Sequence, residues 1–123
     1  MFPIDDNRLG IYGIDVSGHG ISSALMTARL AGFLTAGVPD QNIALRKMKN
    51  GQYRVRPPAE TMSLLNERIL SEIDTDLYFT MLLAICDQTS GEIVFSQAGH
   101  PSPVIQRASG PIETGGAGGL PVR

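Results

Sequence analysis

The stretch that most constrains this chain is residues 13–20, with the sequence Gly-Ile-Asp-Val-Ser-Gly-His-Gly. A nearly continuous apolar run over residues 9–15 ends in a carboxylate, and a glycine-rich turn separates it from a segment of small residues. Such a run predicts a strand that is covered on both faces. An ionised carboxylate after this strand is costly unless a cation or hydrogen bonds compensate it, so Asp15 is the first candidate site residue.

Two interpretations of Asp15 follow from its position. Mg²⁺ and Mn²⁺ prefer oxygen ligands, often one or two carboxylates with water, and Val16 could add its backbone carbonyl where the chain turns. Alternatively, Asp15 accepts amide hydrogen bonds from the following turn and binds no metal. Spacing does not decide between them, because one carboxylate does not make a catalytic metal site.

The turn after Asp15 has its own candidate chemistry. Ser17 acts as a nucleophile only if a base and an oxyanion hole converge on it, and the sequence lacks the Gly-x-Ser-x-Gly motif. Gly18 and Gly20 weakly indicate a phosphate-cradling loop, but neither common nucleotide-binding glycine motif is present. We therefore expect Ser17 and His19 to form the turn, with His19 partly exposed.

Two helices are expected in the first half of the chain. The first covers about residues 22–36, with Ser22 as its cap and Gly37 with Pro39 as its stop. The second covers about residues 59–73. Their periodic residues are Leu25, Met26, Arg29, Leu30, Phe33 and Leu34, then Met62, Leu65, Ile69 and Ile73. We expect Met26 and Phe33 in the core.

Between the helices, residues 38–57 break the helical pattern. They hold five of the ten basic residues of the chain: Arg46, Lys47, Lys49, Arg54 and Arg56. Composition favours a solvated, mobile basic loop or insertion. The alternative is a positively charged flap that meets a phosphorylated partner.

The second half of the chain carries strand signals. Strands are expected at residues 78–86, 92–98, 104–107 and 111–114, and a short strand at residues 2–4 is expected to form a hairpin with residues 9–15. Because helices gather in the first half and strands in the second, the pattern favours an α+β fold with antiparallel sheet. His100 lies in a proline-fixed corner and is expected to be structural.

Composition limits the classes of function. The 123 residues suit one domain, and a net charge of −2 with no tryptophan predicts no nucleic-acid partner. The single cysteine, Cys86, indicates a reducing, cytoplasmic setting. No run reaches the roughly 18 apolar residues of a membrane span, so no membrane insertion is expected.

Together these residues resemble the metal-dependent protein phosphatase 2C-type (PPM) serine/threonine phosphatases, in their bacterial SpoIIE-like branch. The motifs that carry the resemblance occur in order at residues 15–20, 23–26, 64–68, 79–81, 98–103 and 118–121. Each motif is modest alone, but together they are specific. They cover most of the chain apart from residues 38–57.

The resemblance implies an antiparallel β-sandwich flanked by α-helices, with two Mn²⁺ or Mg²⁺ ions between the sheets. A metal-bound water would attack a phosphoserine or phosphothreonine. Asp15 matches the bridging, catalytic carboxylate and Val16 matches the carbonyl donor, within the motif that Ser17, Gly18, His19 and Gly20 complete. The implied partner is a phosphorylated regulatory protein, in this branch often an antagonist of an anti-sigma factor. The domain often follows a sensor or a response-regulator receiver of two-component signalling.

The chain also departs from the family pattern. An acidic motif upstream of the first turn and two further metal-binding aspartates downstream of residues 118–121 are missing from it. We therefore expect residues 1–123 to be one partial phosphatase domain that is a poor catalyst alone. The alternatives are a catalytically silent partner-binding module of the same fold and, more weakly, a nucleotide-binding domain. The sequence does not determine the oligomeric state, and a homodimer is kept as one option.

Overall fold

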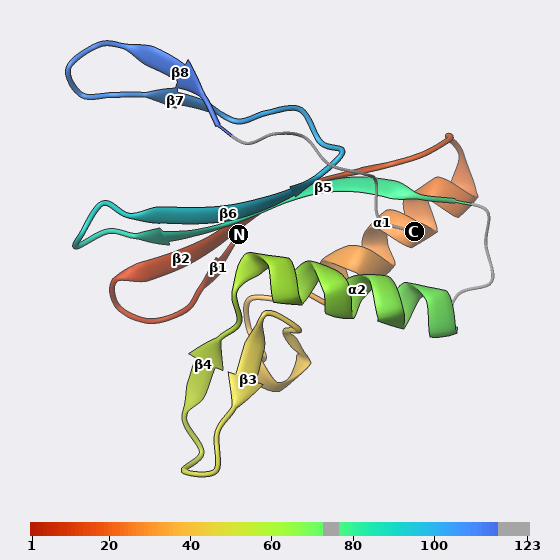
Figure 1. The fold of residues 1–123 in the computed structure, drawn as a ribbon. Coiled ribbons are helices and arrows are strands. Elements are labelled where there is room, and N and C mark those ends of the chain that lie inside the picture. Colours follow the sequence, from red (N-terminus) through yellow and green to blue (C-terminus); the bar gives the residue numbers. More distant parts are fainter. Residues whose placement is uncertain (73–76, 116–123) are drawn as a thin grey trace.

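The computed structural model describes residues 1–72 and 77–115, and its centre is a four-stranded antiparallel sheet (Figure 1). The strands lie in the order β1-β2-β5-β6, with bounds Phe2–Pro3, Arg8–Val16, Phe79–Asp87 and Ile93–Ala98. β2 and β5 pair along their whole lengths, from Arg8 opposite Asp87 to Val16 opposite Phe79. This long ladder fixes the register of the strand that ends at the predicted site.

Two helices, α1 (Ile21–Gly32) and α2 (Pro58–Glu72), lie on the same side of this sheet (Figure 1). Strand alternation sends Tyr12, Ile14 and Val16 toward the helices, where they pack against the buried cluster. The cluster comprises Phe2, Met26, Leu30, Phe33, Leu34, Ala44, Met62, Leu65, Ile69, Phe79, Met81, Leu83 and Ala98. Met26 and Phe33 are therefore in the core, as predicted. Leu25 is instead 66% exposed.

The ends of α1 differ from the prediction. The residue before the helix is Gly20, which provides no side-chain cap, and Ser22 lies inside the first turn rather than at the cap. The helix ends at Gly32 and not near residue 36. The carbonyls of Phe33 and Thr35 accept hydrogen bonds from the Ile43 amide and the Asn42 side chain, at 2.7 and 3.0 Å. These tertiary bonds take the place of another helical turn.

Residues 38–57 contain regular structure where their composition predicts a loop. A short 3₁₀ helix, η1 (Pro39–Gln41), precedes a hairpin of β3 (Leu45–Lys47) and β4 (Tyr53–Val55). The turn of the hairpin is held locally, because Asn50 Oδ1 accepts from the Gln52 amide at 3.0 Å. An Asn-Gly pair between two strands predicts a hairpin, whereas the basic composition of this segment favours a loop.

The second half of the chain follows the prediction closely. Besides β5 and β6, it forms a hairpin of β7 (Val104–Gln106) and β8 (Ile112–Thr114). This hairpin lies on the side of the sheet away from the helices (Figure 1). The strand ends agree with the expected ones to within one residue. The α+β class with antiparallel sheets is therefore confirmed.

Two parts of the prediction lie outside the described residues: the last residue of the second helix, Ile73, and the motif at residues 118–121. Among the described helices, none is both long and apolar enough to cross a membrane.

Candidate functional site

Asp15 lies near the end of β2, directly opposite Thr80 of β5. Because Ile14 and Val16 face the helices, alternation directs the Asp15 side chain to the other face of the sheet, where it is exposed. Within the described part of the chain, its carboxylate makes no hydrogen bond or ion pair. The turn amides therefore do not cap it in this structure.

The backbone N–H and C=O groups of Val16 point away from β5. The Ser17 amide donates to the Tyr78 carbonyl at 2.8 Å, so Ser17 and Tyr78 occupy the position of a hydrogen-bonded pair just beyond the end of the ladder. Such pairs alternate with non-hydrogen-bonded ones, so the Val16 carbonyl points to the opposite edge of β2. On that edge β1 pairs only with Leu9 and Gly10. The carbonyl of Val16 is therefore outside the pairing of the described sheet.

Ser17 holds the turn in place through two hydrogen bonds. Its hydroxyl oxygen accepts a hydrogen bond from the Tyr78 amide at 3.0 Å, and its carbonyl accepts one from the Ser23 hydroxyl at 2.8 Å. The first bond links the turn to the start of β5 and the second links it to α1. Neither histidine is hydrogen-bonded to Ser17 in the described structure. This arrangement is that of a turn-former and not of an activated nucleophile.

Gly18 and Gly20 give the turn its shape. Their φ angles are 76° and 90°, a region that side chains disfavour, and Gly20 combines its angle with ψ of −162°. At Gly18 a Cβ would also lie 3.3 Å from the Ser23 hydroxyl oxygen. His19, between them, is exposed and makes no hydrogen bond among the described residues. The glycines thus bring the chain from β2 directly into α1.

His100 lies on the same face of the sheet as Asp15. Its Nδ1 is 3.2 Å from the Thr80 hydroxyl, and a Cβ at Gly13 would be 3.3 Å from its Nε2. Gln97 donates from its side-chain amide to the His100 carbonyl. These contacts fit the structural role predicted for His100. The contact with Thr80 was not predicted, and its only sequence signal is a hydroxyl within an apolar run.

The described residues fit one side of a cation site. The Asp15 carboxylate and Val16 carbonyl belong to adjacent residues, and both offer the oxygen donors that Mg²⁺ and Mn²⁺ prefer. Over residues 1–72 and 77–115, however, no three acidic, histidine or cysteine side chains gather closely enough to hold a metal. Asp15 is therefore a suitable ligand, and a metal ion bound to it would need further ligands beyond the described residues.

The chain belongs to the family of Stage II sporulation protein E (SpoIIE), whose family model matches residues 5–122. This membership confirms the SpoIIE-like resemblance of the sequence motifs. The chain is also similar to the phosphoserine phosphatase RsbP of Bacillus subtilis (strain 168), with 30% identity over 109 residues. That match covers 89% of this chain and 25% of RsbP, so the chain spans about a quarter of this relative.

Proposed function

We propose that this chain belongs to a metal-dependent phosphatase that removes phosphate from phosphoserine or phosphothreonine on a regulatory protein in bacterial signalling. The observation that carries the proposal is the exposed Asp15 carboxylate, which no described residue neutralises. The family membership and the similarity to RsbP, a phosphoserine phosphatase, support the same reaction class.

In this proposal Asp15 and Val16 hold one side of a Mn²⁺ or Mg²⁺ site, which contains two ions when complete. When bound, such ions lower the pKa of a coordinated water and neutralise charge on phosphoryl oxygens. The chain itself keeps the Asp15 carboxylate at a fixed strand position and outside any ion pair of the described part. Ser17, Gly18 and Gly20 position the turn beside it, and His19 contributes an exposed side chain.

The proposed substrate is a phosphorylated protein, with an antagonist of an anti-sigma factor as the leading candidate. The cytoplasm is the proposed location, because the single thiol of Cys86 suits a reducing compartment. A homodimer is one proposed state of the protein.

The direct test is Mn²⁺-dependent hydrolysis of a phosphoserine protein by the protein in its full natural length. Asp15→Asn keeps the shape of the side chain and removes its charge. We expect a loss of turnover of at least about 100-fold at fixed Mn²⁺, since losing a metal ligand costs at least as much as losing a supporting residue. Calorimetric titration with Mn²⁺ should show weakened binding in the same variant.

Asp6→Asn is the matched control, because it removes an exposed carboxylate from the turn before β2. We expect it to keep wild-type turnover and Mn²⁺ affinity. Turnover that survives both Asp15→Asn and chelation by EDTA would contradict the metal-dependent mechanism.

The second candidate is a catalytically silent module that binds a partner through the same fold. It is favoured by the absence of a three-ligand cluster among the described residues. For this candidate, the folded full-length protein would bind a phosphorylated partner with equal affinity in Mn²⁺ and in EDTA and would release no phosphate. Phosphate release that depends on Asp15 would exclude it.

A further inference from the structure

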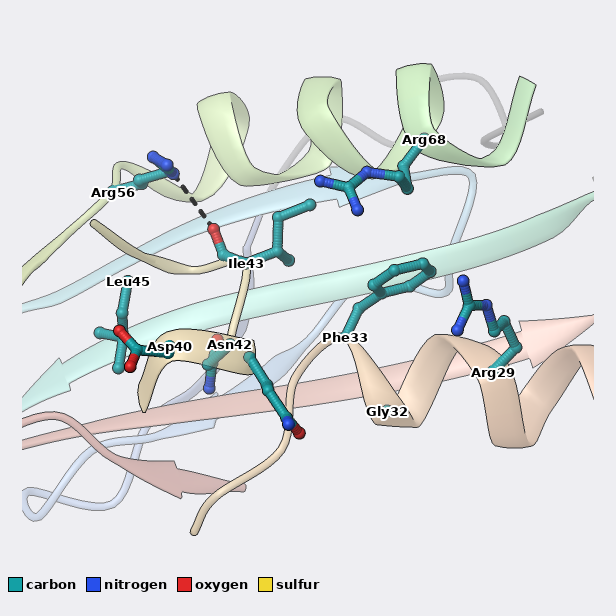
Figure 2. A pocket seen from close by; sticks show the side chains of 10 residues that line it. Arg29, Gly32, Phe33, Asp40, Asn42, Ile43, Leu45, Arg56 and Arg68 are labelled. Carbon is teal, nitrogen blue, oxygen red and sulfur yellow. Dashed lines mark hydrogen bonds between the residues drawn. The ribbon is translucent and has the colours of Figure 1, made fainter. Parts of the chain in front are cut away.

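The β3–β4 hairpin projects from the helix side of the central sheet (Figure 1). Residues 45–55, which we call the basic hairpin, contain no Asp or Glu and four basic residues: Arg46, Lys47, Lys49 and Arg54. The base of the basic hairpin is held to the rest of the protein, since Arg56 donates from Nε to the Ile43 carbonyl at 3.1 Å (Figure 2). The basic segment that composition predicts as a loop or flap is thus an anchored pair of strands.

Two arginines lie directly opposite each other in the basic hairpin. Arg46 and Arg54 are register partners, and both are exposed. Among the described residues, no side chain pairs with either guanidinium group. Like charges in directly opposite positions destabilise a strand pair. A negative charge placed beside these two arginines would therefore be favourable.

The outer edge of β4 carries backbone groups that no strand of the described structure pairs with. The Met48 amide donates to the Gln52 carbonyl at 2.7 Å, so these residues form a hydrogen-bonded pair at the turn. Because such pairs alternate with non-hydrogen-bonded ones, the N–H and C=O groups of Tyr53 and Val55 point away from β3. In the described sheets, β4 has β3 as its only neighbour. Its outer edge can therefore accept another strand.

The two faces of the basic hairpin differ in chemical character. Strand alternation places Arg46 and Arg54 together on one face. The other face carries three large apolar or aromatic residues and one lysine: Leu45, Val55, Tyr53 and Lys47. A strand that lies along β4 would meet positive charge on one face and mainly apolar side chains on the other. The segment that fits both faces alternates acidic and apolar residues.

A hollow of about 290 Å³ adjoins the end of β4. Val55 forms part of its wall, together with apolar residues from the entry to α2 and from β5 and β6: Pro57, Pro58, Ile85 and Val94. The charged residues of the wall are two of each sign: Arg8, Arg56, Asp87 and Glu92. Because these charges balance, the hollow suits an apolar side chain of the same added segment.

We propose that β4 binds an extended acidic segment of a partner protein as an added antiparallel strand. All the described pairs of named strands are antiparallel, and the added strand continues that pattern. Its acidic residues lie beside Arg54 and its apolar residues beside Tyr53 and Val55. Neighbouring strands are about 4.8 Å apart, so a carboxylate opposite Arg54 is also within about 10 Å of Arg46, a distance over which salt leaves charges coupled.

Other occupants match fewer of these features. A second copy of this chain pairing through β4 would bring the arginine faces of two basic hairpins together, and like charges there are unfavourable. A nucleic acid or an anionic lipid surface matches the charge but cannot pair with the backbone edge at Tyr53 and Val55.

This docking site goes beyond the proposed catalysis and does not depend on it. Arg8, which lines the hollow, precedes Asp15 on β2 by seven residues, or about 23 Å at 3.3 Å per residue. A partner held at β4 is therefore bound at a place separate from the candidate metal ligand.

The test is fluorescence anisotropy with the full-length protein and a labelled peptide whose core, Glu-Val-Glu-Val-Glu, is flanked by Gly and Ser. A peptide with Gln in place of Glu should bind at least about tenfold more weakly, because charge-assisted hydrogen bonds to arginine are lost. In the proposed register, the valine N–H groups point toward β4 and the glutamate N–H groups point away. N-methylation of both valines should therefore abolish binding. N-methylation of two glutamates should change the dissociation constant by less than about threefold.

Protein variants test the arginine face separately. Arg46→Gln/Arg54→Gln should weaken binding of the acidic peptide by at least about tenfold. It should melt at or above the wild-type temperature, since it removes two like charges that face each other. The matched control, Lys47→Gln/Lys49→Gln, removes the same charge from the same hairpin but not from the arginine face. It should change the dissociation constant by less than about threefold.

The peptide comparison uses the wild-type protein, so it decides the proposal even if a variant fails to fold. Binding that survives N-methylation of the valines would overturn the added strand. Equal losses in the arginine and lysine variants would overturn it in favour of general electrostatic attraction. Full displacement of the peptide by equimolar single-stranded DNA or by anionic phosphatidylserine vesicles would assign the basic hairpin to those partners instead.

Discussion

The hydroxyl oxygen of Thr80 lies 3.2 Å from Nδ1 of His100, at the position of β5 directly opposite Asp15. The same imidazole lies over Gly13, two residues before Asp15 on β2. His100 therefore spans the two strands of the ladder on the face that carries Asp15. The corner after β6 thus supports the strand end that presents the candidate metal ligand.

Thr80→Val should weaken this support while keeping the shape of the side chain. We expect the free energy of unfolding to fall by about 1 kcal/mol, the usual net value of a hydrogen bond. Urea denaturation measures the change, and Thr80→Ser should recover most of it. Thr89→Val, which alters an exposed threonine of the β5–β6 turn, serves as the control. Equal losses at both sites would mean that the contact with His100 contributes nothing.

Gly10→Ala should destabilise the sheet, because the ring of Phe2 occupies the space above this glycine. A Cβ there would lie 2.2 Å from the nearest ring atom, and Phe2 is completely buried. Overpacking of this kind costs about 1–3 kcal/mol, which thermal or urea unfolding can measure. Gly32→Ala is the matched control, since nothing lies within 4 Å of its Cβ position. That variant should be neutral or stabilising, and a loss as large as that of Gly10→Ala would refute the packing argument.

Asp5 should make the fold sensitive to acid. Its hydrogen bond with the Arg8 side chain, and then that with the Asn7 amide, hold the pKa of this carboxyl below its ordinary value of 3.8. A lowered pKa in the folded state stabilises the fold above the ordinary value, and this stability is lost as the pH falls through the folded-state pKa. Asp5→Asn keeps an acceptor for the turn amides but removes the titration.

Melting temperatures measured between pH 7 and pH 2 provide the readout for Asp5. The wild-type protein should lose more stability on acidification than Asp5→Asn does. Asp6→Asn changes the adjacent exposed carboxylate and should behave like the wild type. Identical acid sensitivity in all three proteins would show that the turn makes no measurable contribution.

Ser17→Ala should separate a role in the turn from a role in the reaction. The variant loses the acceptor of the Tyr78 amide, which should lower the free energy of unfolding by about 1–3 kcal/mol as that amide loses its partner. Under conditions where the variant is folded, turnover of a phosphoserine protein should remain within about tenfold of the wild type. A loss of turnover approaching that of Asp15→Asn, without loss of stability, would restore Ser17 as a nucleophile.

The strands were predictable because their signals are local. Alternation of apolar side chains, glycine-containing turns and proline-fixed corners set their ends, and the structure agrees to within one residue. The end of α1 was not predictable in this way, since it depends on hydrogen bonds from the distant Asn42 and Ile43. The β3–β4 hairpin was overlooked because its basic composition outweighed the Asn-Gly turn signal.

The candidate site was only partly predictable from the sequence. Asp15, Val16 and the glycine turn are consecutive, so one motif identifies them. The contact between Thr80 and His100 depends on the register of β5 and on the path of the chain after β6.

The hydrogen bond between Tyr78 and Ser17 joins residues that are 61 positions apart, with both helices and the β3–β4 hairpin in the intervening chain. Contacts of such long range slow folding, because the loop must close before the pairing stabilises it. During synthesis, β2 is therefore made well before the strand that pairs with it. Until β5 emerges from the ribosome, the edge of β2 that will pair with it is exposed to other chains. The arrangement that presents Asp15 thus also leaves this edge of β2 without its partner until most of the chain has been made.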